Sequence, residues 1–111
     1  MADRPKIDPG RLGERVTPQI AIDAPDGAGG AVRAWQSQEP LWAAIRPLSA
    51  SPEVRAGRTD ALRRYEITVR GTAGLRPGMR LLWRARTLHI IATRSLDARE
   101  RYLLLLCEER L

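Results

Sequence analysis

The sequence predicts an all-β fold, a small antiparallel barrel or sandwich of about six strands. Several segments alternate apolar and polar residues with a period of two, which is the pattern of a strand with one buried face. Short connections rich in glycine and proline separate these segments, and no segment has the apolar spacing of a long helix. A chain of 111 residues is long enough for one such domain and too short for two independent cores.

The first residues, 1–13, are polar and contain prolines, which predicts an extended N-terminal arm ahead of a single domain at 14–111. The first strand is expected over Glu14–Asp23. Pro18 within it cannot donate a ladder hydrogen bond, so the strand lies at a sheet edge or is bulged there. Further strands are expected at Ala31–Ser37, Leu41–Leu48, Arg64–Arg70, Met79–Arg84, Thr87–Thr93 and Arg101–Glu108.

Residues 49–61 are small and polar and lack a strand period. Ser51 followed by Pro52 is typical of the start of a helical turn, and Gly57 would end it. Such a helix is too short to be stable alone. We therefore expect a long loop with one short helical turn.

The formal net charge is +6, and 18 of the 19 basic residues are arginines. The whole excess lies in residues 56–111, which hold twelve arginines and six acidic residues. Arginines that flank or alternate with apolar strand residues are expected on the outer face of the sheet, namely Arg64, Arg70, Arg80 and Arg84. Such a face is either simply solvated or meets phosphates or the carboxylates of another subunit, since the guanidinium fork suits both.

No catalytic, cofactor-binding or metal-binding constellation is present in the sequence. Cys107 and His89 are the only residues of their types and both fall within predicted strands, where we expect them to have structural roles. Glu108 and Glu109 lie at a chain end expected to fray, a poor place for acid–base chemistry. The longest apolar run, Tyr102–Cys107, has six residues and is too short to cross a membrane.

Taken in order, these segments resemble the head–tail joining family of long-tailed phages, the small head-completion, head-closure or stopper proteins. The resemblance covers roughly residues 8–109. It is carried by Asp8–Leu12, Glu14–Thr17, Gly29-Gly30, Trp35, Leu41–Ala43 with Ile45 and Pro47, Tyr65–Arg70, Leu75–Arg80, Arg86–Ile90 and Leu103–Glu108. Two positions depart from the family pattern. Pro18 replaces an aliphatic or aromatic residue, and Ala85 replaces a glycine, which argues against a positive-φ hairpin at that turn.

The resemblance implies a non-enzymatic β-barrel without cofactor. It implies a homo-oligomeric ring (hexamer or dodecamer) in the virion neck of a phage or gene transfer agent, assembled in the bacterial host cytoplasm. The ring would close the DNA channel after packaging and dock the tail. Its partners would be the adaptor or portal ring above, the tail terminator or tail tube below, and packaged double-stranded DNA bound without sequence specificity, with no membrane involved.

The family also implies that the loop at 49–61 gates the channel. Its candidate channel-facing residues are Ser51, Glu53, Arg55, Gly57 and Arg58. The four outward arginines are candidate contacts to subunits or DNA. Two other functions stay open: a tail terminator in the same neck, and a basic small-barrel module that binds nucleic acid.

Overall fold

The structure, a computed structural model, describes residues 12–48, 51–55, 58–71, 74–97, 99 and 101–110, and it confirms the all-β fold. For residues 51–55 and 58–61 the description is of the backbone. Every pairing within this part of the chain is antiparallel. The strands are β1 (Glu14–Pro25), β2 (Ala31–Ser37), β3 (Leu41–Pro47), β4 (Ser51–Arg55), β5 (Arg58–Arg70), β6 (Arg80–Trp83), β7 (Arg86–Ser95) and β8 (Tyr102–Arg110). No helix able to span a membrane occurs in the described residues.

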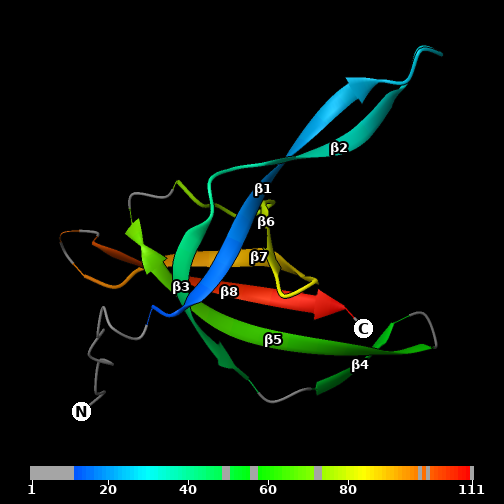
Figure 1. Ribbon diagram of the computed structural model, residues 1–111. Coiled ribbons are helices and arrows are strands. Elements are labelled where there is room, and N and C mark those ends of the chain that lie inside the picture. The colour runs from blue at the N-terminus through cyan, green and yellow to red at the C-terminus, as the bar shows by residue number, and fades with distance from the viewer. Residues whose placement is uncertain are drawn as a thin grey trace.

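The sheet closes on itself as a barrel. Its strands follow the order β1-β3-β5-β8-β7-β6, and β6 pairs back to β1 through Thr17–Gln19. Six strands therefore form the ring, which agrees with the predicted barrel of about six strands, and the expected strand Ala31–Ser37 (β2) lies outside it. Figure 1 shows this barrel with β2 and β4 lying outside the ring, each paired to one long strand.

Alternation along the strands fills the barrel interior with aliphatic side chains. Val16, Ile67, Leu81, Leu88 and Leu105 are fully buried. Burial of this kind contributes about 1.5–3 kcal/mol for each large aliphatic side chain, which makes the interior the main source of stability. The predicted N-terminal arm lies outside the described residues except for its last two positions, of which Leu12 is buried against the barrel.

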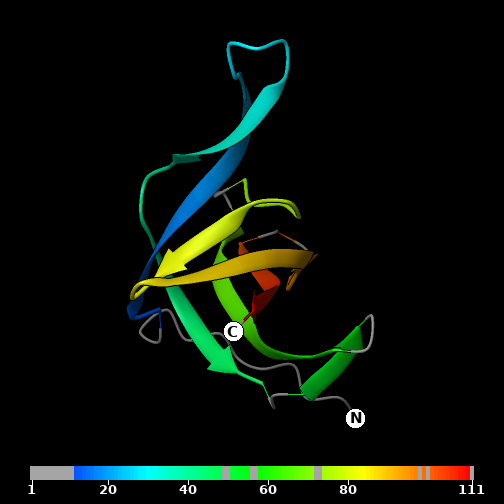
Figure 2. The same ribbon diagram turned by 90° about the vertical axis from the view of Figure 1, so that its right-hand side faces the viewer.

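The strand β1 extends beyond the barrel. Its first half pairs with β3, and from Gln19 to Pro25 it pairs with β2. The segment from Gln19 to Ser37, here named the projecting hairpin, extends away from the barrel in both views (Figures 1 and 2). Pro18 lies where β1 changes partner, and its carbonyl accepts a hydrogen bond from the Gln38 amide at 2.8 Å. A residue without an N–H is tolerated there because no ladder donor is required.

The expected helical turn near Ser51 is wrong. Residues Ser51–Arg55 form β4, which pairs with Arg58–Leu62 at the start of β5. The Ser-Pro signal for a helix start is local, and the backbone hydrogen bonds offered by a neighbouring strand outweigh it. The β4–β5 hairpin extends beyond the barrel on the side where β8 ends (Figures 1 and 2).

The turn between β6 and β7 also differs from expectation. Arg84 and Ala85 both adopt positive φ, at 47° and 63°, although neither is glycine. Two central residues with positive φ match the twist of a two-residue hairpin, so the sheet geometry imposes the conformation that the sequence argues against. The Arg84 side chain is held by Glu14 at 2.9 Å, which offsets part of the cost.

Candidate interaction surfaces

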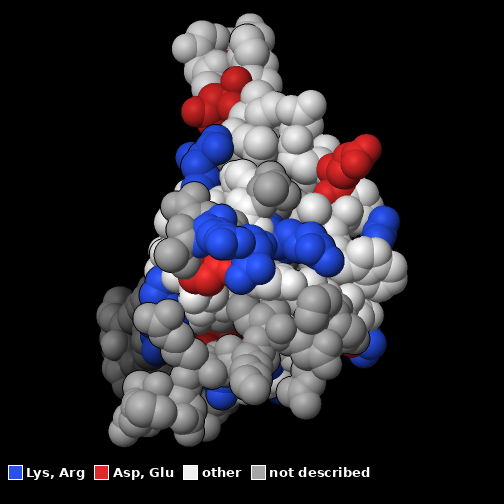
Figure 3. All heavy atoms as spheres, turned by 90° about the vertical axis from the view of Figure 1, so that its left-hand side faces the viewer, with Lys and Arg blue, Asp and Glu red and all other residues white. Residues whose placement is uncertain are grey.

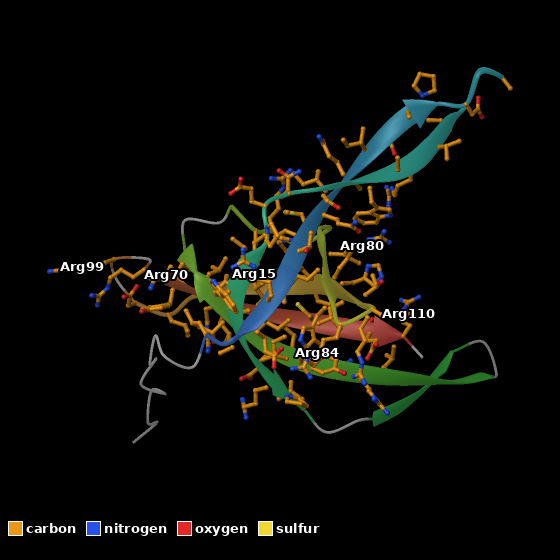
Figure 4. All side chains as sticks on the ribbon, viewed as in Figure 1. Arg15, Arg70, Arg80, Arg84, Arg99 and Arg110 are labelled. Carbon is orange, nitrogen blue, oxygen red and sulfur yellow. The ribbon has the colours of Figure 1, made fainter. Side chains whose placement is uncertain are left out.

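The four arginines predicted on the outer face of the sheet do point outward. Tyr65, Val69 and Leu81 are buried, so alternation places their strand neighbours Arg64, Arg70 and Arg80 on the opposite side. Arg84 follows β6 in the turn before β7 and is exposed there. Figure 4 labels Arg70, Arg80 and Arg84 at separate places around the barrel. The structure therefore does not bring the predicted set together into one site.

Two of these arginines are bound to groups within the same chain. The Arg80 guanidinium donates to the Gln19 amide oxygen at 2.6 Å and lies 4.1 Å from the Trp35 ring centroid. Arg84 donates to the Glu14 carboxylate and lies 5.5 Å from the Trp83 ring centroid. These contacts give both arginines a role in holding the fold.

The remaining two differ in their surroundings. Arg64 is within 3.9 Å of the Glu108 carboxylate. Arg70 is exposed and has no acidic partner among the described residues. Of the predicted set, Arg70 is thus the one whose charge is most available to another molecule.

A row of outward residues crosses the barrel where the projecting hairpin leaves it. Gln19 pairs with Arg80, Arg80 with His89, His89 with Glu108, and Glu108 with Arg64. Trp35 covers one end of this row, with its ring centroid 6.4 Å from that of His89 in an edge-on arrangement. The row fastens the base of the projecting hairpin to the barrel. Single-sequence patterns do not reveal it, because the pairing partners are far apart along the chain.

A second outward row contains an exposed tryptophan between two arginines. Arg15 pairs with Trp42, and its guanidinium carbon lies 4.6 Å from the Trp42 ring centroid. The β3–β5 register, continued by two residues, brings Trp42 opposite Arg70, which pairs with Tyr102. We name these four residues the Trp42 face. The Trp42 side chain is 54% exposed, and neither arginine has an acidic partner among the described residues.

The Trp42 face belongs to the basic side of the molecule. Figure 4 labels Arg15 and Arg70 on the left of the barrel. Figure 3, which views the molecule from that left-hand side, shows basic side chains gathered in the middle of the face. Sequence reasoning found Arg70 but missed Arg15 and Trp42, since an aromatic residue in a strand is usually buried. The signal that could have revealed Trp42 is its position next to Ala43. Successive strand residues face opposite sides of a sheet, so if Ala43 faces the core, Trp42 faces solvent.

The expected fraying of the Glu108-Glu109 pair is wrong, because both lie within β8. Glu109 is 8% exposed, and its carboxylate accepts a 3.0 Å hydrogen bond from the Tyr65 hydroxyl. Arg86 donates to the same hydroxyl oxygen at 3.0 Å. Glu109, Tyr65 and Arg86 thus form a hydrogen-bonded polar cluster at one end of the barrel.

The two single-occurrence residues have structural settings. Cys107 is fully buried, and burial raises the pKa of its thiol to about 12. His89 lies within β7 and faces outward beside Trp35. Among the described residues, no three histidine, cysteine or acidic side chains gather in a way that could hold a metal ion.

Comparison with known proteins identifies the family. Residues 7–110 match the sequence profile of the phage head completion protein family. The chain belongs to this family. No curated protein sequence matches it significantly.

Two solved structures resemble this head completion protein along almost its whole length. One is a chain of the virion of a native gene transfer agent particle, with 27% identity, a TM-score of 0.74 and coverage of 97% of this chain and 98% of that one. The other is the solution structure of protein SF1141 from Shigella flexneri 2a, with 25% identity, a TM-score of 0.68 and coverage of 93% and 96%.

Proposed function

We propose that this head completion protein forms a ring in the neck of a tailed phage or of a phage-like particle such as a gene transfer agent. There it closes the DNA channel after packaging and offers the surface on which the tail docks. The likeness of nearly the whole chain to a chain of a gene transfer agent virion carries this proposal. A small barrel whose polar clusters are engaged in internal contacts supports a structural rather than an enzymatic role.

The partners follow from that position. Copies of the chain form a hexameric or dodecameric ring, with the adaptor or portal ring above and the tail terminator or tail tube below. Double-stranded DNA passes through the centre without being read for sequence. Assembly takes place in the cytoplasm of the bacterial host.

The proposed gate is the β4–β5 hairpin, which carries the candidate residues Ser51, Glu53, Arg55, Gly57 and Arg58. Gly57 and the side chains of the other four lie outside the described residues. The support is in the backbone: β4 pairs with β5 alone, and β5 meets β8 only from Leu62 onward. A two-stranded hairpin held at one end moves at lower cost than a barrel strand does.

The gate is tested by shortening the hairpin. Deleting residues 51–58 removes β4 and should leave the barrel folded, since β4 lies outside its closed ring. Particles assembled with this variant should lose DNA, measured as nuclease-protected genome per particle. Ala85→Gly particles, altered at the far smaller β6–β7 turn, serve as the matched control. Normal genome retention by the deletion variant contradicts the gate.

The ring function is tested by omitting the protein from assembling particles. Heads should fill, leak DNA and carry no tails in electron micrographs, and adding the purified protein should restore both properties. Heads that keep their DNA but lack normal tails favour the tail terminator instead. Particles that are unaffected contradict both roles in the neck.

A further inference from the structure

One face of the projecting hairpin is apolar and uncovered. Residues of β1 with even numbers continue the face that carries Val16 and Pro18 inside the barrel, and Ile20 still packs against the core. Beyond Ile20 the hairpin leaves the barrel, and its apolar face continues along β1 and β2. Its outer part consists of Ile22, Ala24, Val32 and Ala34, which share one face because Ile22 pairs with Ala34 and Ala24 with Val32.

Two large aliphatic side chains of this face are exposed to solvent. Ile22 is 41% exposed and Val32 is 56% exposed. An isolated two-stranded hairpin is at best marginally stable in water, and it becomes stable when its apolar face is covered. Exposed apolar patches of this kind mark interaction sites.

The opposite face and the tip of the hairpin are already well supported. Asp23 and Arg33 form an ion pair at 3.8 Å, and Trp35 packs against Arg80. At the tip, the Asp26 carboxylate accepts hydrogen bonds from the backbone amides of Ala28 and Gly30, at 2.8 Å and 3.0 Å. The opposite face and the tip of the hairpin thus make contacts of their own, whereas the apolar face is not covered.

We infer that the apolar face of the projecting hairpin packs on the Trp42 face of a second copy of this chain. The two surfaces are complementary. The hairpin offers aliphatic side chains and an acidic tip, because Asp23 balances Arg33 while no basic side chain among the described residues contacts Asp26. The Trp42 face offers an exposed indole between two arginines without acidic partners. Complementary charge at such contacts selects the partner and its orientation.

The geometry excludes contact of the hairpin with the Trp42 face of its own chain. Both surfaces include parts of β1, and a strand advances about 3.3 Å per residue, so roughly 30 Å separates Arg15 from the hairpin tip. In Figure 4, Arg15 and Arg70 lie at the centre and left of the barrel, whereas the hairpin tip lies at the upper right. A contact between two different surfaces is head-to-tail, and a head-to-tail contact repeated with rotation closes into a ring. The inference thus rests on the proposed ring and names the surfaces that join its subunits.

The test uses two variants of the full chain, each with one surface removed. Ile22→Asp with Val32→Asp removes the hairpin surface, and Trp42→Ala with Arg70→Glu removes the Trp42 face. All four side chains are exposed, and unchanged thermal unfolding will verify the fold. Association is measured by sedimentation velocity and native mass spectrometry at protein concentrations up to millimolar.

We expect the unaltered chain to form oligomers larger than dimers and each variant alone to be monomeric. An equimolar mixture of the two variants should form dimers and nothing larger, because it contains one intact hairpin and one intact Trp42 face per pair. A Trp42-face variant that still dimerises alone would show a hairpin–hairpin contact and overturn the inference. An unaltered chain that stays monomeric overturns it as well.

Disulfide trapping provides a second measurement. A mixture of Ile22→Cys and Trp42→Cys chains should give a cross-linked dimer under mild oxidation, whereas either chain alone should give none. Arg33→Cys, on the other face of the hairpin, is the matched control and should not cross-link to Trp42→Cys. The native Cys107 is buried and does not interfere. Equal cross-linking by the control overturns the inference.

Failure of this inference can be told apart from failure of the proposed function. The function is judged by DNA retention and tail attachment in particles, and the inference by contacts between purified chains. If particles require the protein but Ile22→Cys in those particles cross-links to a different neck protein, the proposed function stands. The inference is then wrong, because that protein and not a second copy of this chain covers the apolar face of the hairpin. If purified chains cross-link as expected but particles do not need the protein, the inference stands and the function falls.

Discussion

At the scale of single residues, the β6–β7 turn stores conformational strain. Ala85 has a φ of 63°, a conformation that costs an L-residue with a Cβ roughly 1–2 kcal/mol. Glycine adopts the same conformation without that cost, although it loses more entropy on folding.

We therefore expect Ala85→Gly to stabilise the protein by about 1 kcal/mol, raising the melting temperature by about 4 °C. Thermal unfolding followed by circular dichroism measures the shift. Gly78→Ala is the matched control of opposite sign: Gly78 has a φ of 93°, and its added Cβ would meet no atom within 4 Å, so any loss comes from backbone strain alone. If Ala85→Gly lowers the melting temperature, the conclusion that the positive φ of Ala85 strains the turn is wrong.

The Tyr65 hydroxyl is the centre of the buried polar group at the end of the barrel. It donates to Glu109 and accepts from Arg86. Tyr65→Phe would leave a buried carboxylate oxygen without this donor, and we expect a loss of about 1–3 kcal/mol in the free energy of unfolding. Urea unfolding measures it. Tyr102→Phe, whose hydroxyl contacts no polar group among the described residues, should change stability by less than about 0.5 kcal/mol.

At the scale of elements, most strands could be predicted because each carries its own alternation. Ile67 and Leu81 fall where period-two patterns place buried residues, and both are fully buried. The strand β4 could not be predicted, since Ser51–Arg55 has no alternation and becomes a strand only by pairing with β5. The projecting hairpin was not foreseen for a related reason: its strands were predicted one by one, but which strand continues past the barrel depends on non-local register.

The candidate site could be predicted only in part. Alternation placed Arg70 on the outer face, but it could not show that Arg80 and Arg84 are occupied by Gln19 and Glu14, which come from a strand far away in sequence. The same limit hid the pairing of Arg15 with Trp42. Local patterns give the direction of a side chain, whereas its partners follow from the sheet order.

The tip of the projecting hairpin depends on the ionised form of Asp26. The backbone amides of Ala28 and then Gly30 donate to its carboxylate and lower its pKa below the ordinary 3.8. A depressed carboxyl pKa stabilises the turn above the unfolded-state value, and this contribution is lost as the pH falls through the folded-state value. Amide shifts of Ala28 and Gly30 followed by NMR should therefore titrate with a midpoint below 3.8.

Gly30→Ala should abolish that low midpoint. A Cβ at Gly30 would lie 2.6 Å from Oδ2 of Asp26, so the carboxylate must shift, and Oδ1, which accepts both amide hydrogen bonds, shifts with it. Gly13→Ala, with no atom within 4 Å of its added Cβ, is the control and should leave the titration unchanged. A midpoint for Ala28 that does not respond to Gly30→Ala contradicts the role of Asp26 in the turn.

At the scale of the whole molecule, we do not expect the net charge of +6 to make the single chain a strong nucleic-acid binder. Several arginines contact acidic partners in the same chain, among them Arg46 with Glu66 and Arg101 with Asp97. Phosphate binding would have to break or share these contacts. The charge is thus spread over the barrel, and one group of basic side chains lies on the side of the Trp42 face (Figure 3).

We expect the purified chain to bind free duplex DNA more weakly than micromolar at physiological salt, in gel-shift titrations across a salt series. Single-stranded DNA should bind no better, because exposed aromatic side chains do not form a stacking row. Arg15→Gln with Arg70→Gln should remove most of the remaining affinity, and Arg110→Gln is the matched control. Micromolar or tighter binding by the monomer would favour the nucleic-acid-binding module over the neck protein.

The division of β1 between barrel and hairpin has a mechanical consequence. The strand shares seven residue pairs with β2 but only three with each of its barrel neighbours, β3 and β6, whereas β5 and β8 share nine. A force applied to the hairpin therefore acts on the two shortest ladders of the barrel, those of β1 with β3 and with β6. We expect β1 to separate from the barrel before the other strands do. Amide exchange at Thr17 and Gln19 should accordingly outpace exchange at Ile67 and Leu105. A molecule that binds the hairpin would therefore also affect the stability of the two ladders through which β1 closes the barrel.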